Sequence, residues 1–371
     1  MRIKTITCHD VYNVGASLQA YALVMYLRSL GHEAEIIDYK PDYLSNHYRL
    51  WGLSNPAYDK PVLRELYNLA KLPRRLKARC SKRKKCFDTF TRDYLPKTPR
   101  RYTSNDDLKR NPPEADVYFA GSDQIWNCFF QNGRDPAFYL DFAPEGCIKA
   151  SYAASFATED VAEEWKPQVR QWLSGLDSIS VRESSGVEIV ERLGIPGAVQ
   201  VLDPVFLLPK EEWEQLAQPL PKKEPFIFLY DFDRNDALGK AVRDLADRKG
   251  WKVYSYLTNP YADCCFDQYG PLTFLSLVKD AQLVMSNSFH ATAFSLIFKT
   301  NFWVINREEA INTRMRDLTR LVGVPERLLT DFNTDLLINV DWEKVKACMN
   351  YQIDQSKKYL FNITHSNFAP C

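Results

Sequence analysis

The sequence predicts an α/β fold in which two domains face a central cleft. Its 371 residues exceed what one hydrophobic core ordinarily serves. Short apolar runs alternate with helical patterns from residue 3 and again from residue 226, which is typical of parallel sheets covered by helices. Between the halves, Pro209–Pro225 ends in proline and charge and marks a boundary. We expect an N-terminal domain over residues 1–208, a C-terminal domain over 222–341, and a last helix within 342–371 that could pack back on the first domain.

The composition excludes several classes of protein. Lys and Arg total 48 against 47 Asp and Glu, so the net charge is close to zero and does not favour binding to nucleic acid. No run approaches the roughly 18 apolar residues of a membrane span, and the N-terminus enters a strand without a signal-peptide pattern. The nine cysteines include no CxxC pair, and we interpret them as reduced thiols. A cytoplasmic location is expected, with the inner face of the membrane as an option.

The chain opens with a β–loop–α–β pattern. Ile3–Thr7 and Glu35–Tyr39 are predicted strands, and apolar residues at helical spacing predict the helix between them. The turn Cys8–Ser17 contains Asn13 and Gly15 but lacks the GxGxxG and P-loop patterns. A plain turn and a ligand-binding loop both remain open.

Residues from about 41 to 110 are predicted to form an irregular, basic insertion. Nine Lys and Arg side chains fall within Lys71–Lys85, which contains no acidic residue. A solvated helix face would explain such a run. The sharper hypothesis is contact with an anionic glycan or with a lipid diphosphate at the membrane surface. A nucleic-acid-binding arm is a third option, which the even overall charge disfavours.

Two polar segments follow predicted strands in the first half. Gly121–Asn127 comes after the strand Ala115–Ala120 and combines hydrogen-bonding side chains with a tryptophan. Aromatic faces stack on sugar rings and polar side chains bind hydroxyls, so we expect a sugar site here. Arg182 follows the strand Asp177–Val181. It could bind a carboxylate or phosphate in bidentate fashion, or pair with Glu183.

The second half repeats the alternation and places a histidine at a strand end. His290 begins a helix after the predicted strand Ala281–Met285, with Ser286 and Ser288 in the turn between them. Open α/β sheets bind ligands at this edge, and a helix start offers N–H groups to an anion. We therefore expect an anion site that contains a proton-transfer group; a buried core histidine is the alternative. The other predicted elements are strands at Phe226–Tyr230, Lys252–Leu257 and Phe302–Ile305, and helices at Asp236–Arg248, Leu272–Lys279, after Asn312, and about Trp342–Tyr359.

Taken together, seven segments resemble the polysaccharide pyruvyl transferase family. They occur in family order and are Asn13–Tyr21, Gly121–Asn127, Ser151–Phe156, Ser180–Glu183, Leu202–Pro204, Ser286–Ala291 and Thr313–Met315. The resemblance implies two Rossmann-like domains arranged as in the GT-B glycosyltransferases. It also implies an enzyme that moves the enolpyruvyl group of phosphoenolpyruvate onto a sugar of a surface polysaccharide or its lipid-linked precursor. The product would be a cyclic ketal, with release of phosphate.

The resemblance also assigns roles to residues. His290 matches the family's motif histidine, and Arg182 matches an arginine implicated in holding the donor. Asp123 is expected to be a catalytic base or a hydroxyl-binding group. Many members have arginine where this chain has Ser288, so Arg182 or Arg314 would have to supply the missing positive charge. The N-terminal motif also departs from the family, since many members have aspartate where this chain has Ala16. The remaining expected site residues are Ser286, Ser288 and Arg314 for phosphoenolpyruvate, and Asn13, Gly15, Ser122, Gln124, Trp126 and Asn127 for the acceptor sugar.

This chemistry requires neither a cofactor nor a metal ion, because general acid–base steps suffice. Asp231-Phe232-Asp233 does look like the DxD motif that holds a divalent ion in nucleotide-sugar glycosyltransferases. A glycosyltransferase of the same fold is therefore the first alternative function, and a catalytically inactive glycan-binding module is the second. The acceptor sugar, its hydroxyls and the ketal stereochemistry are not specified by the sequence.

Overall fold

The computed structural model describes residues 1–371 except 45–47, 49, 52–59, 308–312, 330–335 and 366–371. Its first sheet is parallel throughout and has the strand order β3-β2-β1-β4-β5. The strands are β1 Arg2–Ile6, β2 Glu33–Tyr39, β3 Lys97–Tyr102, β4 Val117–Ala120 and β5 Ile148–Ser151. A two-stranded parallel pair, β6 Ser180–Val181 and β7 Val199–Gln200, continues from it through the bridges Ala150–Ser178 and Ala154–Val181.

The second sheet is also parallel, with the order β10-β9-β8-β11-β12-β13. Its strands are β8 Phe226–Tyr230, β9 Lys252–Ser255, β10 Cys264–Cys265, β11 Leu283–Ser286, β12 Phe302–Ile305 and β13 Leu328–Leu329. In both sheets the chain starts at the centre, proceeds to one edge, and then returns to the other side. This reversal of strand order is the doubly wound arrangement, and it confirms the predicted fold class.

Helices cover these sheets because their apolar residues repeat at helical spacing. The two that begin at the site, α1 Val14–Ser29 and α10 Phe289–Phe298, are almost entirely buried. They pack in one core with the short turn η6 Pro204–Phe206. The other helices of the two halves are α5 Lys166–Leu173, α6 Ser184–Arg192, α7 Lys210–Leu216, α8 Asp236–Lys249, α9 Pro271–Lys279 and α11 Thr313–Leu321.

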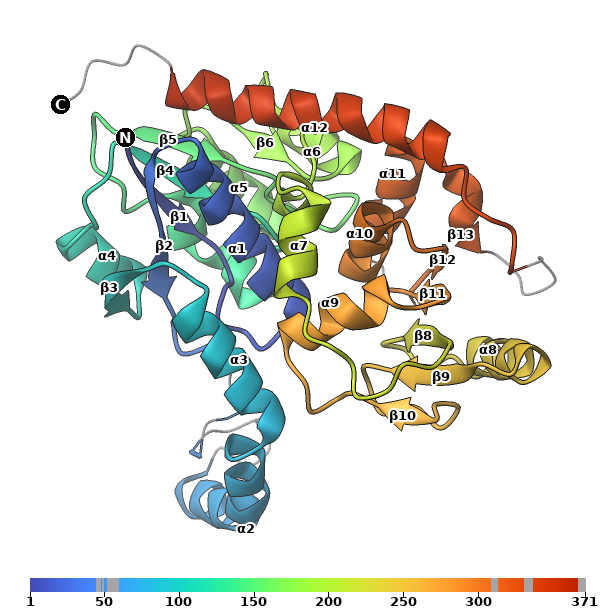
Figure 1. Cartoon of the computed structure of the whole chain (residues 1–371). Coiled ribbons are helices and arrows are strands. Elements are labelled where there is room, and N and C mark those ends of the chain that lie inside the picture. The colour runs from blue at the N-terminus through green and yellow to red at the C-terminus, as the bar shows by residue number, and fades with distance from the viewer. Residues whose placement is uncertain (45–47, 49, 52–59, 308–312, 330–335, 366–371) are drawn as a thin grey trace.

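The expectation of an irregular segment over residues 41–110 is wrong for most of the described part. This part contains α2 Pro61–Arg79, α3 Lys82–Asp93, strand β3 and α4 Asn105–Arg110. Ser81 begins α3 by accepting a hydrogen bond from the Lys84 N–H, and Phe87 and Phe90 anchor that helix in the core. Leu72, Leu76, Phe87 and Phe90 form only a partial apolar stripe in the sequence, because Lys and Arg residues stand between them. In Figure 1, α2 and α3 form an arm that projects from the body of the molecule.

The last helix, α12 Trp342–Thr364, lies across both halves of the molecule (Figure 1). Ser356 on this helix accepts a hydrogen bond from the Leu202 N–H, and the Tyr359 hydroxyl donates to the Ser151 carbonyl. The helix therefore packs back on the N-terminal half. Among the described residues, none of the helices combines the length and apolar content that crossing a bilayer requires.

Candidate functional site

A cavity of about 460 Å³ lies between the two sheets, at the carboxyl ends of strands from both. The segments after β1 and β4 supply residues between 8 and 15 and at 123–124. The segments after β8, β11 and β12 supply the opposite wall. Of the predicted site residues, the cavity is lined by Asn13, Gly15, Asp123, Gln124, Ser288, His290 and Arg314.

Gly15 lets the two halves meet at the site. Asn13 begins α1, and its side-chain oxygen accepts hydrogen bonds from the N–H groups of Gly15 and Ala16 at 2.9 and 3.2 Å. A Cβ atom on Gly15 would lie 2.0 Å from Nδ1 of His290. The imidazole therefore occupies the space that a side chain would fill, and the first turns of α1 and α10 face each other. Both helix starts present positive dipole ends to the cavity.

The turn before His290 is held by its own serines. The Ser286 hydroxyl donates to the Tyr230 carbonyl at 2.7 Å and accepts from the Ser288 N–H at 2.9 Å. Ser288 begins α10 and lines the cavity. Ser286 does not line the cavity, so its expected contact with the donor is replaced by a structural role in shaping the turn.

Asp203 lies behind His290, and this partnership was not predicted. Its Oδ2 is 3.6 Å from Nε2 of His290 and 2.7 Å from Nη1 of Arg182. Burial would raise the pKa of Asp203, but His290 and Arg182 outweigh it and lower the pKa to about 2. Asp203 is thus a buried, ionised carboxylate beside the imidazole. The Leu202-Asp203-Pro204 segment was the sequence signal for it.

Arg182 is buried among acids and does not line the cavity. Its guanidinium lies 2.7 Å from Asp203, 3.2 Å from Glu183 and 3.7 Å from Asp123. Burial alone would lower the pKa of Arg182, but these carboxylates raise it above its usual value. The pairing with Glu183, the alternative left open by the sequence, is the one observed. Arg182 therefore orders Asp123 and Asp203 instead of facing a ligand.

Arg314 is the buried cation that does face the cavity. Among the described residues, no carboxylate lies within salt-bridge distance of it, and its Nε has no hydrogen-bond partner. Burial and the nearby charge of Arg182 lower the pKa of Arg314 to about 10, so it remains protonated at neutral pH. With its amide oxygen turned toward Arg314, Gln124 accepts from both Nη atoms at 3.0 and 2.9 Å. A buried cation that contacts a neutral amide is suited to binding an anion.

Three of the expected acceptor residues lie away from the cavity. Trp126 is 0% exposed, stacks on Tyr139 with ring centroids 5.5 Å apart, and donates from Nε1 to the Phe138 carbonyl. Ser122 and Asn127 are also buried. The interpretation of Trp126 as a sugar-stacking face does not agree with this placement, because apolar packing encloses the ring. The aromatic side chains that do line the cavity are Tyr12, Phe130, Tyr230, Phe232 and Phe289.

The Asp231-Phe232-Asp233 segment is used to build the loop after β8. The carboxylate of Asp231 accepts from the N–H groups of Asp233 and Asn235 and from the Asn287 amide. Asn287 also donates to Asp233 at 3.0 Å, which ties this loop to the turn before His290. Within the described parts of the chain, no group of three His, Cys, Asp or Glu residues is arranged to hold a metal ion.

Two further residues of the cavity bear on its chemistry. Cys8 lines it, and burial raises the pKa of its thiol well above the usual value, so it stays protonated. Arg307 lies on the opposite wall with its guanidinium over the Phe232 ring and 3.7 Å from Asp233. Arg307 follows the predicted strand Phe302–Ile305, so strand-end position was the signal that could have identified it.

Comparisons with known proteins agree with this architecture. The family model described as polysaccharide pyruvyl transferase matches residues 13–309. No curated protein matches the sequence. A structure from Listeria monocytogenes assigned as a UDP-N-acetylglucosamine 2-epimerase is similar in fold, with a TM-score of 0.56 at 11% identity over 99% of this chain and 96% of that one. The UDP-GlcNAc 2-epimerase from Neisseria meningitidis bound to UDP-GlcNAc has a TM-score of 0.49 at 12% identity, over 99% and 100% of the two chains.

Proposed function

The chain belongs to the polysaccharide pyruvyl transferase family, and from this premise we propose that it transfers the enolpyruvyl group of phosphoenolpyruvate onto a saccharide. The acceptor would be a sugar of a surface polysaccharide or of its lipid-linked precursor. The observation that carries the proposal is Arg314, a buried cation that shares the cavity with His290 and has no carboxylate partner among the residues that the structure describes. Phosphoenolpyruvate carries phosphate and carboxylate groups, so its site needs such a cation.

Because Ser288 stands where many members of the family have arginine, other groups must bind the donor. Ser288 supplies no charge, so the cavity relies on Arg314, Arg307 and the first turns of α1 and α10 to bind an anion. Arg182, buried behind the cavity, would act through Asp123 and Asp203.

The reaction needs a proton at the methylene carbon of phosphoenolpyruvate and removal of two hydroxyl protons. Protonation of that carbon gives an oxocarbenium-like centre at C2, which a first sugar hydroxyl attacks with loss of its proton. The bond between C2 and the phosphate oxygen then breaks and phosphate leaves. A second hydroxyl attacks the same carbon and loses its proton, which closes the cyclic ketal.

His290 is our candidate for the acid that delivers the proton to carbon. The ionised carboxylate of Asp203 lies 3.6 Å from Nε2, on the far side of the ring. Asp123 lines the cavity within 3.7 Å of Arg182 and is our candidate for accepting a hydroxyl proton. Each such acid–base contribution is worth about 10²–10⁴-fold in rate.

The acceptor would lie against Asn13, Gln124 and the aromatic side chains of the cavity. Tyr12 and Phe232 come from opposite halves of the molecule, so a sugar ring between them would contact both. The saccharide would therefore bridge the N-terminal and C-terminal walls next to His290.

Ligand-dependent stabilisation tests the donor. Phosphoenolpyruvate should raise the melting temperature of the purified protein, and UDP- and GDP-sugars should not, because a ligand that binds the native state stabilises it. Phosphate release with a panel of acceptor sugars, followed by NMR of the ketal methyl group, tests the transfer. Stabilisation by a nucleotide sugar alone would favour a glycosyltransferase. Binding of saccharides without phosphate release under any condition would favour a glycan-binding module.

A further inference from the structure

The arm formed by α2 carries an exposed apolar stripe. Val62, Leu66, Leu69 and Leu76 are 72, 57, 54 and 45% exposed. They are spaced three, four or seven residues apart, so they lie along one face of the helix. With Leu63, five of the fourteen exposed large hydrophobic side chains of the described chain fall on these 19 residues. Such a concentration marks an interaction surface.

The opposite face of α2 is the one that packs against the protein. Asn68 is fully buried there, and Arg75 donates to its side-chain oxygen and to the Leu50 carbonyl at 2.6 and 3.0 Å. Lys71 and Arg75 also lie over the ring of Tyr67. The helix is therefore fixed with polar groups inward and leucines outward, the reverse of an ordinary surface helix.

The charge of α2 is strongly positive. It contains six Lys and Arg residues and a single acid, Glu65. Arg74, Lys77 and Arg79 are exposed. The basic residues of α3 are used differently: Lys84 pairs with Asp88, and other cations of that helix lie over aromatic rings. On α2, Arg74, Lys77 and Arg79 are therefore the exposed cations of the run Lys71–Lys85 that accompany the apolar stripe.

We propose that α2 docks on the surface of an anionic lipid bilayer, with the stripe of Val62, Leu66, Leu69 and Leu76 inserted among the acyl chains. Leucines flanked by Lys and Arg are the composition of interfacial helices, and each cation near an anionic surface adds to binding. A second copy of this chain would cover the stripe but would bring another helix of the same charge against it. An anionic bilayer satisfies both the apolar and the basic character of α2.

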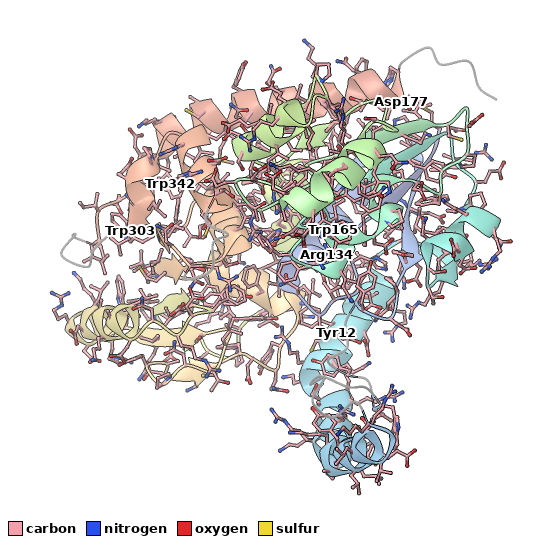
Figure 2. The ribbon with its side chains drawn as sticks, turned by 180° about the vertical axis from the view of Figure 1, so that it is seen from behind. Tyr12, Arg134, Trp165, Asp177, Trp303 and Trp342 are labelled. Atoms are coloured by element: carbon pink, nitrogen blue, oxygen red, sulfur yellow. The ribbon has the colours of Figure 1, made fainter. Side chains whose placement is uncertain are left out.

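The position of α2 relative to the cavity fits this occupant. A second cavity of about 440 Å³ is lined by Arg79 at the end of α2, Lys84, Tyr48 and Trp51. Tyr12 and Leu44 line both this cavity and the one that contains His290. Figure 2 shows Tyr12 where the arm joins the body. Docking of α2 would therefore place the bilayer near a cavity that adjoins the site, and a membrane-bound acceptor, which rests on the proposed function, would approach from that side.

Vesicle co-sedimentation of the full-length protein tests the docking directly and does not depend on catalysis. Vesicles of phosphatidylcholine with 30% phosphatidylglycerol are compared with pure phosphatidylcholine at about 0.15 M salt. The Leu66→Glu/Leu69→Glu variant removes two exposed leucines, and Tyr351→Glu is the matched control, since Tyr351 is 62% exposed on α12. Both substitutions change solvent-exposed positions, and circular dichroism checks that each variant is folded.

We expect binding to the anionic vesicles only, a roughly hundredfold weaker partition for the double variant, and no change for Tyr351→Glu. Absence of vesicle binding, or equal binding by the double variant, would overturn the proposal. A concentration-dependent dimer of the wild type that the double variant abolishes, without vesicle binding, would assign the stripe to a second copy instead. If the wild-type protein binds the vesicles but releases no phosphate from phosphoenolpyruvate with any acceptor, the proposed function is contradicted and the docking proposal stands.

Discussion

Gly15→Ala is a one-carbon change whose effect depends on a residue 275 positions away in the sequence. The new Cβ would lie 2.0 Å from Nδ1 of His290, where ordinary contacts begin at 3.4 Å. The ring must therefore move by at least about 1.4 Å. Overpacking of this kind costs about 1–3 kcal/mol. This cost is offset by up to about 1 kcal/mol, because alanine has a higher helix propensity than glycine.

The structure predicts opposite effects in two backgrounds. In the wild type, Gly15→Ala should lower the free energy of unfolding by about 1–2 kcal/mol. In a His290→Ala background the clash is gone, and the same substitution should be neutral or stabilising by up to about 1 kcal/mol. The coupling between the two positions should therefore be about 2 kcal/mol.

Urea unfolding of the four proteins, followed by tryptophan fluorescence, measures this coupling. Phosphate release provides the functional readout, where a displacement of about 1 Å can cost roughly 10²-fold. The matched control is Gly31→Ala, since its Cβ would meet nothing within 4 Å although its φ of +84° makes it strained in any background. Equal costs of Gly15→Ala with and without the imidazole would refute the reasoning, because His290 would then not occupy the space beside Gly15.

Three further predictions follow from the site. Arg314→Gln should weaken phosphoenolpyruvate binding by roughly 10–100-fold in calorimetry. It should leave stability unchanged or raise it, because the substitution removes a buried cation that has no carboxylate partner in the described part of the chain. Unchanged affinity would exclude Arg314 from the donor site. The folded-state pKa of Asp203, about 2, is below its ordinary value, so its ionised form stabilises the fold above about pH 4 and this contribution disappears as the pH falls through 2. The wild type should therefore lose roughly 2 kcal/mol of stability over this range that Asp203→Asn does not lose. Identical acid profiles of the two proteins would contradict the assignment. Trp126→Ala should cost about 3–5 kcal/mol of stability without weakening saccharide binding by the folded protein, since the ring is fully buried. Selective loss of acceptor binding would show instead that Trp126 belongs to the sugar site.

Local pattern was sufficient to predict most of the fold. Apolar runs such as Phe226–Tyr230 and Phe302–Ile305 coincide with β8 and β12, because a strand buried on both faces has few polar residues to obscure it. The pattern was insufficient in α2 and α3, where eleven Lys and Arg residues interrupt the apolar ones, and for the two-residue strands β10 and β13. Strands that short carry no periodicity, so pairing with a neighbour alone defines them.

The sequence alone determined that His290, Asp123 and Arg314 follow strand ends or begin helices, and hence that they belong to the ligand-binding edge of a sheet. Tertiary structure decided which of these groups face one another. Arg182 turned inward because three carboxylates surround it, Trp126 was enclosed by Tyr139 and Phe138, and Asp203 came to lie behind the imidazole. These outcomes depend on contacts between residues far apart in the chain. A side chain's burial and charge partners are set by those contacts, and local spacing does not encode them.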